Sequence, residues 1–174
     1  METKVPFYNV LNMLLIGLIL IVGVCIAFPG LAIDLIANDV VVGLRAGGNV
    51  IFTTFVFAVA YEVGYLINRL GSVVLEELLK KNKLIPYNDD YRKYNEVKKE
   101  YPTMDILARE YASSRTNIML FLIIMLVEIF AKKFIFALIA FACATLFFSS
   151  CRKHAKRITS LMNKWECGQK SAHM

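Results

Sequence analysis

The chain has 174 residues, of which 57% are hydrophobic, and a formal net charge of +6. Soluble globular domains contain fewer apolar residues, so this composition excludes an ordinary water-soluble domain. The sequence predicts an all-α, polytopic membrane protein that forms one membrane domain over residues 1–174.

Apolar residues are concentrated in three long segments. Two of them are about the length that a helix needs to cross a bilayer core of about 30 Å, which takes about 20 residues. The third, 118–150, is interrupted by Glu128, Lys132 and Lys133 and is long enough for a hairpin of two shorter helices. The predicted transmembrane helices are 10–28, 50–68, 114–130 and 134–150.

The distribution of basic residues favours four spans over three. With four spans and both termini in the cytoplasm, 17 of the 20 lysines and arginines lie on the inner side, and only Arg45, Lys132 and Lys133 lie outside. Three spans would place the basic residues after Cys151 outside and would bury Lys132 and Lys133 in hydrocarbon. We therefore predict a multi-pass protein with both termini cytoplasmic.

The outer loop, 29–49, is mostly apolar and ends in a glycine-rich segment. Its composition is typical of a helix that lies in the outer interface and caps the bundle. A re-entrant segment near a pore mouth, or a contact surface for an external molecule, is the alternative.

The cytoplasmic region, 69–113, is predicted to be helical and to extend the second and third spans beyond the membrane. A further helix in this region is expected to end before Pro102. It carries an aromatic stripe at helical spacing, which indicates either packing or a partner-binding surface. The tyrosines of this stripe that we consider partner-binding candidates are Tyr87, Tyr91, Tyr94 and Tyr101.

Glu62 interrupts the second apolar segment, seven residues before Arg69. About 10 Å of helix therefore separates it from the inner interface, which places a carboxylate in the hydrocarbon region. Such a group must be protonated, paired or in contact with water. We expect Glu62 in the core of the bundle, where Arg69 and Arg115 are candidate partners, in either a helix–helix contact or the lining of a pore.

Glu128 precedes Lys132 by four residues, in the order that favours an ion pair on a helix. An interfacial Glu128–Lys132 pair is therefore expected near the outer end of the third span. A functional role for Glu128 is the alternative.

The segment 151–174 is predicted to be a basic cytoplasmic tail. Its first cations attract anionic lipids of the inner leaflet. Nucleic-acid binding is the alternative, although no recognition fold surrounds these charges. The predicted lipid-contact residues are Arg152, Lys153, Lys156 and Arg157.

Catalytic motifs are missing from the sequence. The two histidines and four cysteines have no metal-ligand spacing, and there is no phosphate-binding glycine loop or nucleophile elbow. We predict a non-enzyme without a cofactor.

The segments GYLINRLGSVVLEELLKK and YPTMDILAREYASSRTN, the second of which precedes a span, resemble those of small four-helix membrane subunits of bacterial phage-defence systems. The nearest in pattern are the membrane subunits of Kiwa systems. The resemblance implies an oligomer in the bacterial inner membrane that senses phage attack and acts with a cytoplasmic, DNA-binding protein partner. Direct nucleic-acid binding by this chain is not expected.

Three functions are consistent with these features. The first is a homo-oligomeric sensor or scaffold that couples a membrane or envelope signal to a cytoplasmic partner. The second is a pore-forming or membrane-depolarising effector in which Glu62 faces water. The third is a small transporter or a transporter accessory subunit, for which the sequence offers few substrate-binding groups.

Overall fold

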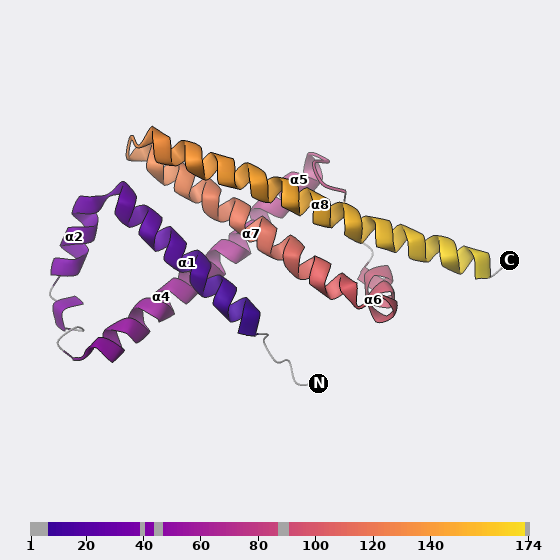
Figure 1. Cartoon of the computed structure of the whole chain (residues 1–174), viewed down its shortest axis with the longest axis horizontal. Helices are drawn as coiled ribbons and strands as arrows, with labels where there is room; N and C mark the ends of the chain where they lie inside the picture. Colours follow the sequence, from indigo (N-terminus) through magenta and orange to yellow (C-terminus); the bar gives the residue numbers. More distant parts are fainter. Residues whose placement is uncertain (1–6, 39–40, 44–46, 87–90, 173–174) are drawn as a thin grey trace.

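The computed structural model describes residues 7–38, 41–43, 47–86 and 91–172. Within these residues all regular structure is helical, which confirms the predicted all-α class. Figure 1 shows the last two long helices running side by side and the first two crossing each other, with shorter helices between and beside them.

Four of the helices are long and apolar enough to cross a membrane, so the protein is a multi-pass membrane protein. Many of their large apolar side chains point outward, for example Ile135 and Leu146 on the last helix, which are 75% and 70% exposed. Outward apolar side chains are what a lipid solvent requires. The four helices are α1 (Phe7–Ala27), α4 (Asn49–Leu70), α7 (Thr103–Phe130) and α8 (Phe134–Ala172).

Helices α7 and α8 are joined by a three-residue turn, so residues 118–150 form two helices. Lys132 adopts a left-handed conformation with φ 60° and forms the C-terminal cap of α7. The ammonium group of Lys133 donates a hydrogen bond to the Ile26 carbonyl at the end of α1. The α7–α8 turn and the end of α1 therefore lie at the same end of the bundle (Figure 1).

Helices α1 and α4 cross at very short distance because two glycines face the partner backbone. A Cβ atom built on Gly17 would lie 1.7 Å from the Ala60 carbonyl oxygen, and one on Gly64 would lie 1.8 Å from that of Met13. Only glycine fits at either position.

Helix α7 is the central element, because it contacts α1, α4, α6 and α8. A buried cluster between the spans includes Ile16 of α1, Ile67 of α4 and Leu120 of α7. The other helices thus pack around α7.

At one end of the bundle, the chain between α1 and α4 forms the short helix α2 (Pro29–Ala37). Its side chains Leu31 and Ile33 are 55% and 67% exposed. Whether this segment lies in the interface or re-enters the membrane stays a prediction.

At the other end, α4 continues without a break through a π-helical turn, η1 (Gly71–Leu75), into α5 (Glu76–Lys81). The separate helix α6 (Tyr91–Glu100) follows and packs against α7 and α8. Helix α8 has 39 residues and extends about 58 Å at helical rise, far more than a bilayer core. Residues 151–172, predicted as a tail, therefore continue the last helix.

Candidate functional site

A buried ion pair joins α5 to α7 at the point where the transmembrane helices give way to the polar end of the molecule. The guanidinium of Arg115 donates to the carboxylate of Glu76, and both side chains are 11% exposed. The Lys80 ammonium lies 3.1 Å from the same carboxylate. Charge-assisted bonds in such a poorly hydrated place are strong but require both partners. We call Glu76, Lys80 and Arg115 the junction.

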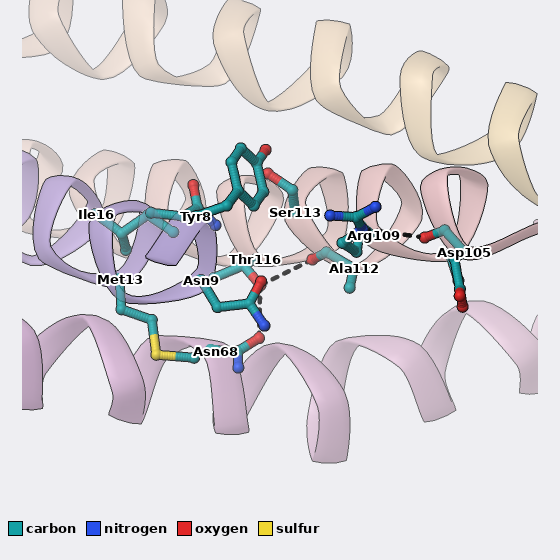
Figure 2. A pocket seen from close by; sticks show the side chains of 12 residues that line it. Tyr8, Asn9, Met13, Ile16, Asn68, Asp105, Arg109, Ala112, Ser113 and Thr116 are labelled. Carbon is teal, nitrogen blue, oxygen red and sulfur yellow. Dashed lines mark hydrogen bonds between the residues drawn. The ribbon is translucent and has the colours of Figure 1, made fainter. Parts of the chain in front are cut away.

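Hydrogen bonds next to the junction connect α7 to the helices on both sides. The Thr116 hydroxyl donates to Asn68 Oδ1 of α4 at 2.8 Å, and it also lies 2.9 Å from the Ala112 carbonyl oxygen (Figure 2). On the opposite side, Ser114 and Ser150 of α8 are hydrogen-bonded at 3.2 Å. Helix α7 is thus held to α4, α5 and α8 at one level of the molecule.

The π-helical turn η1 determines which side chains of this segment face inward. A π turn contains one residue more than an α-helical path and so rotates everything after it. Gly71 and Leu75 within η1 are buried, as are Glu76 and Leu79 directly after it. Leu75 and Leu79 pack in a cluster with Cys151 of α8. The turn therefore brings Glu76 to Arg115.

Beyond the junction, α6 and the ends of α7 and α8 share a small apolar core. Its buried members are Val97, Met104 and Met162, one from each helix. Half-buried Tyr94, Tyr101 and Trp165 pack around them. We call this assembly, residues 91–105 and 158–166, the crown.

Two ion pairs fasten the crown. Lys93 of α6 pairs with Glu166 of α8, and Lys98 Nζ lies 2.8 Å from Asp105 of α7. The hydrogen bond to Asp105 raises the pKa of Lys98 above its ordinary value. Burial raises the pKa of Tyr94, whose phenol therefore stays neutral in the folded crown.

A polar cavity of about 560 Å³ lies between α1, the end of α4 and the first half of α7. Figure 2 shows Asn9 of α1, Asn68 of α4 and Ser113 of α7 among the side chains that line it. These groups donate and accept hydrogen bonds but form no nucleophile–base pair. Among the residues that the structure describes, no group of three or more His, Cys, Asp or Glu side chains is placed to hold a metal.

The structure corrects the predicted position of Glu62. Its side chain is exposed on the outer face of α4 and lies outside the bundle core. Neither candidate partner reaches it, because Arg69 bonds to the Tyr65 hydroxyl at 2.7 Å and Arg115 bonds to Glu76. The physical reason is that the buried face of α4 is the one that carries Ala60 and Gly64.

The predicted interfacial pair between Glu128 and Lys132 is also wrong. Within the described part of the chain these two residues form no ion pair, and Glu128 Oε2 is buried without a hydrogen-bond partner. Helix α7 ends at Phe130, so Lys132 lies in the turn and its exposed side chain is not one helical turn above Glu128.

Of the four tyrosines predicted as a partner-binding surface, the structure describes the side chains of two. Tyr94 and Tyr101 are half-buried and pack on the crown core, which fits the packing alternative for these two. Tyr91 begins α6 but its side chain is not described, and Tyr87 lies outside the described residues. Partner binding by the tyrosines stays a prediction.

The predicted lipid-contact residues all lie exposed on α8. Arg152 and Lys156 line one side of a second cavity, whereas Lys153 and Arg157 do not.

Glu76, Asn68 and Thr116 were missed by sequence reasoning, although Arg115 was selected. A signal for Glu76 was present, because Lys80 follows it by four residues in the favourable order. Nothing in the sequence indicated that Arg115, 39 residues away, would meet the same carboxylate.

No protein-family model, curated protein or solved structure matches the chain. The resemblance to phage-defence subunits therefore rests on the sequence pattern alone. Any function for this protein must be argued from the junction and the crown.

Proposed function

We propose that the protein is a scaffold of the bacterial inner membrane that couples the packing of its transmembrane helices to a cytoplasmic partner bound at the crown. The observation that carries this proposal is the buried Glu76–Arg115 pair, which ties the extension of α4 to α7. Because α7 and α8 run unbroken from the spans into the crown, a shift of α7 moves the crown as well.

The charge distribution supports a cytoplasmic crown. Most lysines and arginines lie on the crown side of the membrane-spanning segments, and the positive-inside rule places that side in the cytoplasm. The resemblance to phage-defence subunits would make phage attack the signal and a cytoplasmic, DNA-binding protein the partner.

The coupling is tested by a distance measurement in bilayers of different thickness. One sample of the full chain is spin-labelled at exposed Glu96 in α6 and Lys164 in α8, and a second sample at Glu96 and exposed Leu66 in α4. Both samples are reconstituted in short-chain and in long-chain lipids. If the proposal holds, the Glu96–Leu66 distance changes with thickness while the Glu96–Lys164 distance stays constant.

Glu76→Gln is expected to abolish this dependence, because it removes the charge that holds Arg115. Glu77→Gln is the matched control, since Glu77 is the next residue, is 71% exposed and lies 3.8 Å from Lys80. A Glu96–Leu66 distance in the unmodified chain that is the same in both lipids would refute the coupling.

A second function, a pore or depolarising effector, is favoured by one observation. Glu62 is a carboxylate inside a span and is exposed on the outer face of the bundle. Water lining it would have to lie between copies of the chain, so this function requires a homo-oligomer. Ion leakage from reconstituted vesicles that falls in Glu62→Gln supports the pore, and unchanged leakage contradicts this role for Glu62.

A further inference from the structure

A second cavity, of about 600 Å³, lies between the loop after α5 and the adjacent face of α8. Among the residues that the structure describes, its lining contains four cationic side chains and no acidic one. The apolar loop residues 84–86 complete it. The cations are Lys80, Lys83, Arg152 and Lys156.

Three of these four cations have no negative partner in the described part of the chain. Lys80 lies against Glu76 and Glu77, whereas the side chains of Lys83, Arg152 and Lys156 make no ion pair or hydrogen bond with any residue that the structure describes. Arg152 and Lys156 are one turn apart, so both point from α8 toward the α5 loop. Like charges that converge on a cavity repel one another unless an anion lies between them.

The backbone at Lys83 is a further sign of a built site. Lys83 has φ 53°, and the bonds Lys83 N to Lys80 O and Leu84 N to Leu79 O form a helix cap that normally uses glycine. A lysine here strains the backbone but adds a positive charge to the cavity. Buried Ile85, 4% exposed, anchors the loop beside it.

The position of the cavity indicates the source of the anion. Arg152 follows the apolar segment of α8 by two residues, so it lies at the level of the lipid headgroups. Leu78 and Leu84 at the same loop are 54% and 44% exposed, as expected where acyl chains reach the protein. A cationic pocket bordered by exposed apolar side chains suits a phosphate that carries acyl chains.

We infer that this pocket binds the phosphate groups of an anionic lipid headgroup. Phosphate is recognised by converging guanidinium and ammonium groups, and lipid headgroups supply it at the level of the pocket. A soluble polyphosphate carries the same chemistry, and the experiment separates the two sources. The inference does not depend on the coupling proposed above.

The test uses the full chain, purified in neutral detergent and stripped of lipid. Binding of cardiolipin, phosphatidylglycerol, phosphatidylcholine and, in a separate arm, inorganic tripolyphosphate is measured by native mass spectrometry. We expect cardiolipin and phosphatidylglycerol to bind and phosphatidylcholine not to bind. Tripolyphosphate binding without lipid binding would support a phosphate pocket but assign it to a soluble ligand.

The decisive comparison is between two double variants of one helix. Arg152→Gln with Lys156→Gln removes two pocket cations and is expected to weaken lipid binding about 25-fold, at about fivefold for each cation. Lys153→Gln with Arg157→Gln removes the same charge at the same spacing outside the pocket, so only the general attraction of surface cations for anionic lipid is lost and affinity is expected to fall less than in the pocket variant. Equal losses in the two variants, or no anion binding by the unmodified chain, would overturn the inference.

A single substitution tests whether a loss of anion binding could be caused by misfolding. Lys83→Gly relieves the backbone and removes the charge, so it is expected to keep the fold and to weaken anion binding about fivefold. Lys132→Gly makes the same backbone change at the other end of the bundle and should leave binding unchanged. Weakened binding in Lys132→Gly, or unweakened binding in Lys83→Gly, would contradict the assignment.

Discussion

Glu76 and Glu128 are both buried carboxylates, but their surroundings differ. Glu76, 8% exposed as a whole residue, accepts a hydrogen bond from Arg115 and lies 3.1 Å from Lys80. Glu128, 2% exposed, has one carboxylate oxygen without a partner and lies in the last turn of α7, where the helix dipole disfavours negative charge. The free-energy cost of burying a charged carboxylate is therefore offset by its cationic partners at Glu76 but not at Glu128.

This contrast predicts opposite effects of one substitution at the two positions. Glu76→Gln leaves Arg115 without its carboxylate and should lower the free energy of unfolding by about 3 kcal/mol. Glu128→Gln removes a charge that has no cation partner and should leave stability unchanged or raise it by about 1 kcal/mol. Trp165 in the crown reports unfolding in detergent by its fluorescence. Equal losses at both positions would show that Glu128 is paired in the membrane.

The sequence contains enough information to predict on which face of α4 Glu62 lies. The depth of Glu62 in the bilayer was easier to predict. Ala60 and Gly64 are small residues four apart, a pattern typical of a close helix contact, and Glu62 lies two residues from each. Two residues correspond to about 200° around a helix, so a contact through Ala60 and Gly64 turns Glu62 away from it. The failure was to treat depth in the bilayer as burial in the bundle.

The crossing of α1 and α4 depends on the absence of two side chains. Gly17→Ala or Gly64→Ala places a methyl group less than 2 Å from a backbone oxygen of the other helix, which is rigid. The helices must separate, and the expected loss is about 2 kcal/mol or more for each substitution. Both are measured as free energies of unfolding in detergent.

Gly168→Ala is the control for this prediction. Gly168 also lies in a helix, but nothing approaches the position of its Cβ within 4 Å. Alanine there should raise stability by about 0.5 kcal/mol through helix propensity. If all three substitutions behave alike, the short α1–α4 distance is not present in the folded protein.

In the extension of α4, the amphipathic pattern predicts that a helix forms but does not predict which of its faces packs against the protein. Periodicity indicates a continuous helix with Val73, Val74 and Leu78 on its apolar face, the face that a soluble helix would pack. These side chains are exposed, by 68%, 51% and 54%, and Leu75, Glu76 and Leu79 are buried. Hydrophobic periodicity does not reveal the one-residue shift that a π turn introduces. Near a bilayer, the apolar face of a helix can also point outward into lipid.

Removing one residue from η1 should restore an α-helical path and rotate α5 by about 100° relative to α4. Deletion of Val74 would then carry Glu76 away from Arg115, and stability should fall by about 3 kcal/mol, as for Glu76→Gln. Val74→Ala, which shortens the same exposed side chain, should change stability by less than about 0.5 kcal/mol. A deletion variant as stable as Val74→Ala would mean that the π turn does not position Glu76.

The number and position of the long helices were predictable, because they depend on where apolar and basic residues lie along the chain. Three apolar segments and the placement of the basic residues indicated four spans, and the described residues contain four helices long and apolar enough to span a membrane. The contacts between distant segments were not predictable, since Glu76–Arg115, Asn68–Thr116 and the crown core join residues far apart in sequence. Small residues four apart are typical of contacts between membrane helices, and Ala60, Ala140 and Ala144 are all buried inside one chain.

For a homo-oligomer we propose another surface, the outer face of α4. There Glu62 is exposed between Ala58 and Leu66, within a span. Lipid leaves a carboxylate without a polar partner, whereas a second copy in the same orientation lets two Glu62 side chains face each other instead of hydrocarbon. We therefore propose a homo-oligomer with α4 helices at its centre.

Cysteine cross-linking in native membranes checks the arrangement. In a background without Cys25, Cys143, Cys151 and Cys167, Ala58→Cys should give a disulfide-linked dimer on oxidation. Ile139→Cys, on an equally outward face of α8 where Ile139 is 55% exposed, should not. Cross-linking at both positions would indicate random collision, and cross-linking at 139 alone would move the interface to α8. Adding Glu62→Leu to Ala58→Cys should reduce the dimer if the carboxylate holds the copies together, because leucine is as well solvated by lipid as by a second copy.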